Sequence, residues 1–240
     1  MKKLLLVMIT ILIVYGALGY SQEALFGTRP FIQLSIEFST MEAGRETNRT
    51  VVLYSRTEAG ITDVYTRVEN PTFLRNLQFL SLGRQAGQPE QWVRTSSGLR
   101  RLPQSSQGEA LFSSAVENTD IILPVLNPVP KESAALPPEF SHLQTYQAES
   151  FKFFESPDGL RRYYKGEQSG LIYGFDVYES SGNRVKTYRV QEIQVVQGEV
   201  LPSNAIMEDT RSRRTTRLTV EEVSFPGVIP ARFFNPQALR

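Results

Sequence analysis

Apolar and polar residues alternate along most of the chain after residue 29, and this pattern limits the folds open to it more than any other feature. In PFIQLSIEF, Ile32, Leu34, Ile36 and Phe38 fall on one face of an extended strand, and the residues between them fall on the other. The stretch GLIYGFDVYES alternates in the same way. We find no long stretch with the period of an amphipathic helix, so the sequence predicts a mainly β fold.

Turn residues separate the predicted strands at short intervals, as in an antiparallel meander. Residues 58–60 join RTVVLYSRT to ITDVYTRVEN, residues 96–98 join QWVRT to GLRRLP, and a Pro-Asp-Gly turn interrupts SFKFFESPDGLRRYYKG. We expect TFLRNLQFLSLGR to be a strand with a bend and RRTTRLTVEEVSF to be a late strand. Small helices are predicted within residues 108–121 and 138–147.

A proline-rich stretch, LPVLNPVPKESAALPPEF, separates two halves of similar pattern. Five of the chain's 14 prolines lie between Pro124 and Pro138, which predicts a loop or strap without regular sheet pairing. The stretch could instead link two domains, but an open β unit of half this size would bury little core. We therefore expect one sheet with a long excursion across its face.

The N-terminus has the three parts of a secretory signal. Lys2 and Lys3 precede an apolar run, and Ala17, Gly19 and Ser21 offer small-residue cleavage patterns. We predict a signal peptide over residues 1–21 and a single exported domain over residues 22–240, located in the periplasm. An uncleaved anchor is the alternative, because the uncharged run to Gln22 could span a bilayer. The chain has no cysteine, so disulfides cannot stabilise it.

Charge and residue types argue against several functional classes. Without Lys2 and Lys3, 24 of the 26 basic residues remain against 25 acidic ones, so the exported part has no net charge that would attract nucleic acid. His142 is the only histidine, and there is neither a cysteine nor a Gly-x-Ser-x-Gly motif. The sequence therefore suggests no metal, no cofactor and no enzymatic site.

Three sequence elements follow one another between Glu90 and Ile121, and their order is informative. Trp92 lies in a strand, LRRL (residues 99–102) follows as an arginine-rich hairpin arm, and SSAVENTDI (residues 113–121) comes next. The ending TTRLTVEEVSFPGVIPARFFNPQAL places a strand before a tail with Phe234 and Leu239. This order resembles bacterial outer-membrane lipoprotein-sorting proteins, the LolA-like group of the LolA/LolB superfamily. Ala115 and Val116 depart from its pattern, which usually has Asp-Phe there.

The resemblance implies a strongly curved antiparallel sheet, a half-open β-barrel, whose apolar concave face is covered by short helices or a lid loop and holds acyl chains. We expect residues 110–121 to plug the mouth of the cavity and residues 124–138 to act as the lid. Arg100 and Arg101 are expected near a headgroup or a partner. Any β fold must also bury aromatic residues in its core, so each expected cavity residue has a second explanation. The expected cavity residues are Phe73, Leu77, Phe79, Leu80, Trp92, Phe112, Tyr173 and Phe175.

Three functions remain open at this point. The first is a periplasmic carrier for the acyl chains of lipoproteins or lipids, with an inner-membrane exporter and an outer-membrane acceptor as partners. The second is a periplasmic regulator of the same fold that senses lipid or lipoprotein and binds a partner protein. The third is an envelope protein of similar fold that binds no ligand.

Overall fold

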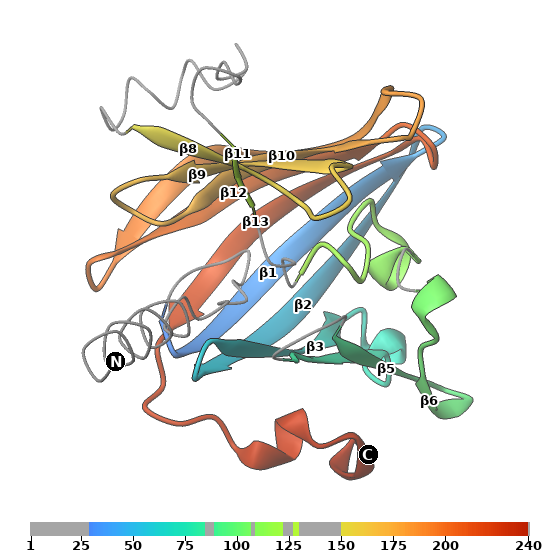
Figure 1. The fold of residues 1–240 in the computed structure, drawn as a ribbon. Helices are drawn as coiled ribbons and strands as arrows, with labels where there is room; N and C mark the ends of the chain where they lie inside the picture. Colours follow the sequence, from blue (N-terminus) through green and yellow to red (C-terminus); the bar gives the residue numbers. More distant parts are fainter. Residues whose placement is uncertain (1–28, 85–88, 107–108, 122–126, 130–149, 240) are drawn as a thin grey trace, which may run out of the picture.

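The described part of the chain forms a single open antiparallel sheet. The computed structural model describes residues 29–84, 89–106, 109–121, 127–129 and 150–239. Within these ranges the strands form one 13-stranded sheet in the order β6-β5-β4-β3-β2-β1-β13-β12-β11-β10-β9-β8-β7. Each half of the chain is a meander, and the two meanders meet where the first and last strands pair (Figure 1). The expectation of one sheet is confirmed.

The strands near the centre of the sheet are the longest. β1 pairs with β2 along its whole length and with β13 over most of it, so both halves share a continuous ladder. The strands are β1 (Phe31–Glu42), β2 (Arg45–Glu58), β3 (Ile61–Asn70), β4 (Gln78–Leu82), β5 (Glu90–Thr95), β6 (Gly98–Arg101), β7 (Asn127–Val129), β8 (Phe151–Glu155), β9 (Arg161–Gly166), β10 (Ile172–Tyr178), β11 (Arg184–Val196), β12 (Glu199–Asp209) and β13 (Arg214–Ser224).

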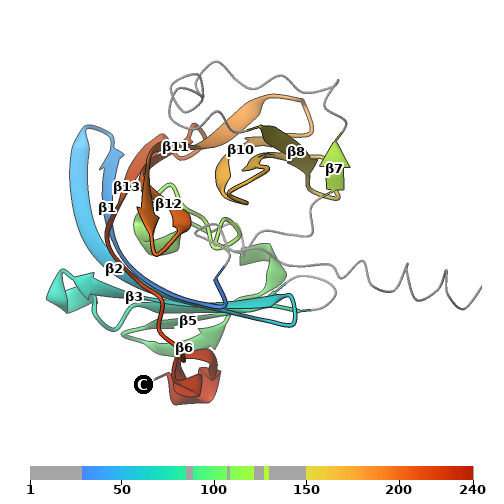
Figure 2. The ribbon, with the colours of Figure 1, turned by 90° about the vertical axis from the view of Figure 1, so that its left-hand side faces the viewer.

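The sheet curves strongly around one of its faces (Figure 2). Alternation in β1 buries Ile32, Leu34, Ile36 and Phe38 on the concave face, as the sequence predicts. Residues 109–121 lie within the curve, whereas the C-terminal tail lies outside it, beneath β5 and β6. That tail contains two short 3-10 helices, η6 (Ala231–Phe234) and η7 (Pro236–Ala238). The predicted curved half-barrel is therefore confirmed.

Two predicted elements have a different structure. The stretch TFLRNLQFLSLGR begins with the 3-10 helix η1 (Thr72–Leu74), and only its second part forms a strand, β4. The proline-rich strap was expected to lack sheet pairing, yet its residues 127–129 form β7 and pair with β8. Because β7 is at the edge of the sheet, Pro128 can be accommodated there without interrupting a central ladder.

Other predictions concern regions that the structure describes only in part or not at all. The sequence predicts a small helix within residues 108–121. The described residues of this region contain one short 3-10 helix, η3 (Leu111–Ser113), together with isolated turns and a β-bridge between Ala110 and Glu117. The predicted signal over residues 1–21, the helix at 138–147 and most of the strap lie outside the described residues. No helix among the residues described is both long and apolar enough to cross a membrane.

Candidate functional site

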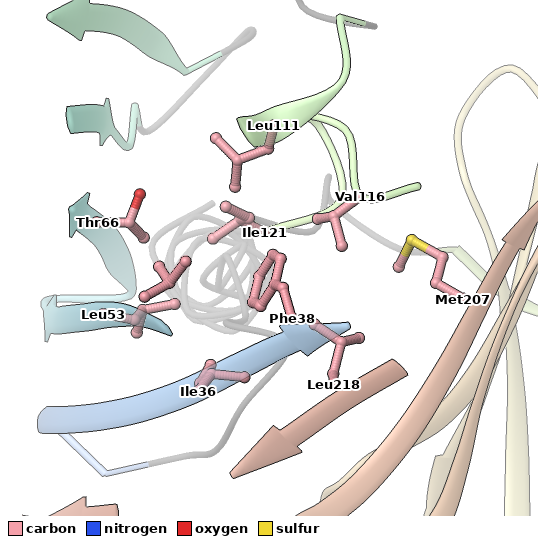
Figure 3. A pocket seen from close by; sticks show the side chains of 10 residues that line it. Ile36, Phe38, Leu53, Thr66, Leu111, Val116, Ile121, Met207 and Leu218 are labelled. Carbon is pink, nitrogen blue, oxygen red and sulfur yellow. The ribbon is translucent and has the colours of Figure 1, made fainter. Parts of the chain in front are cut away.

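The concave face is filled by a segment of the chain itself. We call residues 109–121 the plug. Its apolar side chains Leu111, Val116 and Ile121 face Phe38 and Leu218 of the sheet across a cavity of about 10 Å³ (Figure 3). That volume is close to the space taken by a single water-sized sphere. Among the described residues, the plug therefore nearly fills this part of the apolar face.

Short-range hydrogen bonds, rather than regular structure, shape the plug. The backbone N–H of Leu111 donates to the carbonyl of Val116 at 2.6 Å, and the hydroxyl of Ser114 donates to the carbonyl of Leu111 at 2.7 Å. Phe112 and Ser113 have φ values of 52° and 58°. Residues with side chains adopt such values only when the surroundings hold them there, at a cost of about 1–3 kcal/mol each. The plug is thus a strained turn that other contacts must hold in place.

Two of those contacts are buried ion pairs made by Asp120. Its Oδ2 lies 2.8 Å from Nζ of Lys186 on β11, and both side chains are fully buried. Its Oδ1 accepts a hydrogen bond of 2.8 Å from Nη1 of Arg161 on β9. Burial alone would raise the pKa of Asp120, but Lys186 and Arg161 lower it by more, so its pKa lies below the usual value. The carboxylate is therefore charged at neutral pH.

Glu117 makes a second set of ion pairs from the same side of the plug. Its Oε1 lies 3.1 Å from Nζ of Lys186 and 2.6 Å from Nη2 of Arg211. Arg211 also pairs with Asp209 at 3.1 Å. These groups form what we call the ion cluster: Glu117, Asp120, Arg161, Lys186, Asp209 and Arg211. Its positive and negative charges balance, and it joins the plug to β9, β11 and the turn after β12.

Neutral hydrogen bonds fix the two sides of the plug to opposite arms of the sheet. The backbone N–H of Ala115 donates to Oγ1 of Thr216 on β13 at 2.8 Å. Thr216 in turn shares a hydrogen bond of 2.9 Å with Thr40 on β1. On the other arm, Nε2 of Gln91 on β5 donates to the carbonyl of Asn118 at 3.1 Å. The plug is therefore fastened to both halves of the sheet.

Several residues that the sequence suggested for the cavity belong to the larger of two core clusters, the one that includes the concave face. Phe79, Phe112, Tyr173 and Phe175 are buried in this cluster, and Leu77 is half-buried against it. Phe175 stacks on Tyr188, with ring centroids 5.4 Å apart. Tyr173 packs edge-on against Phe151, with centroids 5.1 Å apart.

The structure places the other three expected cavity residues elsewhere. Leu80 and Trp92 belong to the second cluster, on the convex face, where the tail residues Phe234 and Leu239 cover them. Adjacent strand residues point to opposite faces, so Phe79 and Leu80 could not both face the cavity. Phe73 lies in η1 and is 80% exposed. These three residues are not part of the concave core.

Arg100 and Arg101 lie on the edge strand β6 and are both largely exposed. Arg100 approaches Glu109, at the start of the plug, with 3.7 Å between Nη2 and Oε2. Arg101 approaches Glu90 on the neighbouring strand, with 3.4 Å between Nε and Oε1. Their side chains alternate between the two faces of the sheet, so they do not form a joint site.

The sequence analysis missed Lys186, Arg161 and Glu117 as anchors of the plug. One signal was available for Lys186, because it shares the inward face of β11 with the buried residues Tyr188 and Val190. A lysine among buried apolar residues indicates a buried carboxylate partner. Among the described residues, the ion cluster included, no group of three His, Asp or Glu side chains is arranged to hold a metal ion.

Comparisons with known proteins point to the same fold. A family model described as "Uncharacterized protein" matches residues 160–240. No curated protein sequence matches the chain. A solved structure of a DUF1329 family protein from Desulfovibrio piger is 14% identical, covers 89% of this chain and 92% of its own, and superposes with a TM-score of 0.73.

Two further solved structures are similar. A putative outer membrane lipoprotein-sorting protein domain from Vibrio parahaemolyticus has a TM-score of 0.71 at 13% identity, covering 88% of this chain and 92% of its own. A LolA superfamily protein from Nitrosomonas europaea has a TM-score of 0.64 at 18% identity, with the same coverage of 88% and 92%. This chain therefore has the curved-sheet fold of the LolA superfamily and of outer-membrane lipoprotein-sorting domains.

Proposed function

We propose that this protein is a periplasmic carrier that binds the acyl chains of lipoproteins or lipids on its concave face. It would receive them from an inner-membrane exporter and deliver them to an outer-membrane acceptor. The observation that carries the proposal is the plug: in the part of the chain that the structure describes, a short segment covers the apolar concave surface around Ile36 and Phe38. The similarity in fold to lipoprotein-sorting domains supports the same ligand class.

The plug contacts the sheet as an acyl chain would. Leu111, Val116 and Ile121 place aliphatic groups over Ile36 and Phe38. An acyl chain offers the same kind of surface in a continuous flexible form. Because the cavity between the plug and these described residues is about 10 Å³, binding over Ile36 and Phe38 would require the plug to move away from them.

The free energies make such an exchange feasible. Each buried CH₂ group contributes about 0.8 kcal/mol, so on the order of ten of them contribute roughly 8 kcal/mol. Displacing the plug costs its own apolar contacts and exposes the ion cluster to water. The backbone strain at Phe112 and Ser113 offsets part of that cost, because it is released when the plug opens. Acyl chains and plug would therefore compete for one surface, as a reversible carrier requires.

Native mass spectrometry of the full-length protein purified from an envelope extract tests this proposal, followed by lipid analysis of whatever dissociates. We expect a stoichiometric acylated species. A bare protein mass that takes up neither added phospholipid nor lipopeptide would contradict the carrier proposal. A stoichiometric partner protein without any lipid would favour a regulator instead.

A further inference from the structure

One part of the concave face is polar, and four of its polar atoms have no hydrogen-bond partner among the described residues. Ser55 on β2, Ser81 on β4 and Gln91 on β5 are connected by direct pairing, because Val64 on β3 pairs with both serines and Ser81 pairs with Gln91. Thr66 lies two residues from Val64 on the same face, where it lines the cavity beside Leu53 (Figure 3). We call Ser55, Thr66, Ser81 and Gln91 the polar row.

All four side chains of the polar row are buried, at 2% exposure or less. Among the residues that the structure describes, the hydroxyl oxygens of Ser55, Thr66 and Ser81 and the Oε1 of Gln91 have no hydrogen-bond partner. A buried polar atom without a partner costs about 1–3 kcal/mol, so most native structures contain few. Four such atoms lie on neighbouring strands of the same face. Since they do not stabilise the fold, they indicate another role.

Their chemistry indicates the group that they would recognise. The row carries no charge, so it does not suit a phosphate or a free carboxylate. Serine and threonine hydroxyls can donate to a carbonyl oxygen, and the free atom of Gln91 can only accept, as from an amide N–H. Paired side chains on neighbouring strands lie about 5 Å apart, so one ligand can reach several of them.

The row also lies beside the end of the plug. Gln91 donates to the carbonyl of Asn118 through Nε2, and Ile121 lines the same cavity as Thr66. A ligand that replaced the plug would place its chains over Phe38, Val51 and Leu218 and would reach the polar row at its end. The concave face thus has an apolar part and, beside the end of the plug, a polar part.

We propose that the polar row binds the ester and amide linkages that join acyl chains to the rest of the ligand. This inference rests on the proposed function and adds the ligand class: linked acyl groups, as in diacylated lipopeptides and diacyl phospholipids, rather than free hydrocarbon chains. The acceptor of Gln91 selects for an amide N–H, which an N-acylated lipopeptide has and phosphatidylglycerol lacks.

The test compares ester-linked ligands with ether-linked ones of equal chain length. The probes are an N-acylated lipopeptide with a 2,3-bis(palmitoyloxy)propyl cysteine, its di-O-hexadecyl ether analogue, and the corresponding ester and ether forms of phosphatidylglycerol, titrated into the full-length protein. We expect the ester forms to bind about tenfold more tightly than the ether forms, as for one or two neutral hydrogen bonds. Thr66→Val and Ser81→Ala should reduce that ratio towards one while leaving the ether forms bound as before. Gln91→Leu should reduce binding of the lipopeptide more than binding of phosphatidylglycerol.

A second measurement separates a ligand-binding role from a structural one. Thr66 and Thr40 are both buried on the concave face, but only the hydroxyl of Thr40 has a partner, Thr216 at 2.9 Å. Thr66→Val should leave the apo protein as stable or raise its Tm, whereas the matched Thr40→Val should lower it.

The outcomes are distinguishable. If none of the four probes binds, the carrier proposal fails and the polar row with it. If ester and ether forms bind equally to the wild type, acyl binding stands and the assignment of the polar row is wrong. A fall in Tm for Thr66→Val would likewise overturn it, because the hydroxyl would then be stabilising the fold.

Discussion

Nζ of Lys186 lies 2.8 Å from Oδ2 of Asp120, and neither side chain is exposed to solvent. The pair joins a strand of one sheet arm to the segment that fills the concave face. Because Glu117 and Arg161 meet the same two groups, the plug is held by buried charges rather than by apolar contacts alone. Buried ion pairs are costly to break and depend on pH, so this pair yields direct tests.

Lys186→Met should destabilise the protein by about 3–5 kcal/mol, because it removes the fully buried cation that Asp120 and Glu117 share. Urea unfolding at pH 7 measures the change. The matched control is Glu42→Gln, which removes a pair with Arg214 in which Glu42 is about half exposed, and its effect should be much smaller than that of Lys186→Met. Equal effects of the two variants would mean that the buried pair is not holding the plug.

The stability of the protein should fall in acid. The pKa of Asp120 is depressed in the folded state by Lys186 and Arg161, which outweigh the opposite effect of burial. A depressed carboxyl pKa contributes stability that is fully present above the unfolded value of about 4 and is lost as the pH falls through the folded value. We expect unfolding free energies to decrease from about pH 5 downward, and less steeply for Asp120→Asn. An unchanged slope in that variant would show that Asp120 does not titrate with folding.

Glu117→Gln should raise the apparent affinity for acyl ligands severalfold while lowering the stability of the apo protein. The variant weakens contacts to Lys186 and Arg211, so the open state becomes more populated, and apparent affinity increases with that population. Anisotropy of a fluorescent lipopeptide measures the affinity, with Glu42→Gln as the control. A loss of affinity would mean that Glu117 contacts the ligand rather than the closed plug.

Trp92 should not report ligand binding. It is the only tryptophan in the chain and lies on the convex face under the tail. Acyl chains brominated along their length quench tryptophan on contact, so they should leave Trp92 unquenched. In the double variant Trp92→Phe, Val93→Trp the reporter moves to the concave face, because neighbouring strand residues alternate. Quenching is then expected. Quenching of the wild type alone would place the ligand on the convex face.

The C-terminal tail should contribute to stability independently of ligand binding. Phe233 stacks on Tyr54 and Tyr65, with ring centroids 4.6 and 5.1 Å away, and Phe234 is buried. Phe234→Ala should cost about 3 kcal/mol in unfolding free energy. It should also shift the emission of Trp92 to longer wavelength, since the tail covers that residue. Lipopeptide affinity should not change, and a parallel loss of affinity would contradict the separation of the two faces.

Local patterns predicted the β elements well where alternation was regular. The strands around Ile32 and the hairpin at residues 58–60 follow directly from period-two spacing and turn residues. β12 was not predicted, because Pro202 and a mixed polar sequence hide its alternation. The face of Trp92 was misjudged because the resemblance, rather than its register relative to Val93, guided the assignment.

The candidate site was harder to predict than the fold. The plug position followed from the resemblance at residues 113–121, but its anchors come from strands more than forty positions away, such as Arg161 and Lys186. Charged residues in strands usually face solvent, so a single sequence gives little indication that these are buried. The polar row was equally hard to predict. Ser55 and Ser81 are far apart in the sequence, and only the strand register places them together on one face.

The most direct test of the central claim is to lock the plug to the sheet and measure acyl binding. The chain has no cysteine, so Ala115→Cys with Thr216→Cys provides one defined pair at a point where the Ala115 nitrogen and the Thr216 hydroxyl are 2.8 Å apart. The two single variants under the same oxidising conditions are the controls. If acyl chains replace the plug, the oxidised double variant should take up no lipopeptide, and reduction should restore uptake to the level of the singles. Equal uptake by the oxidised and reduced protein would show that ligands bind elsewhere, and the account would be wrong.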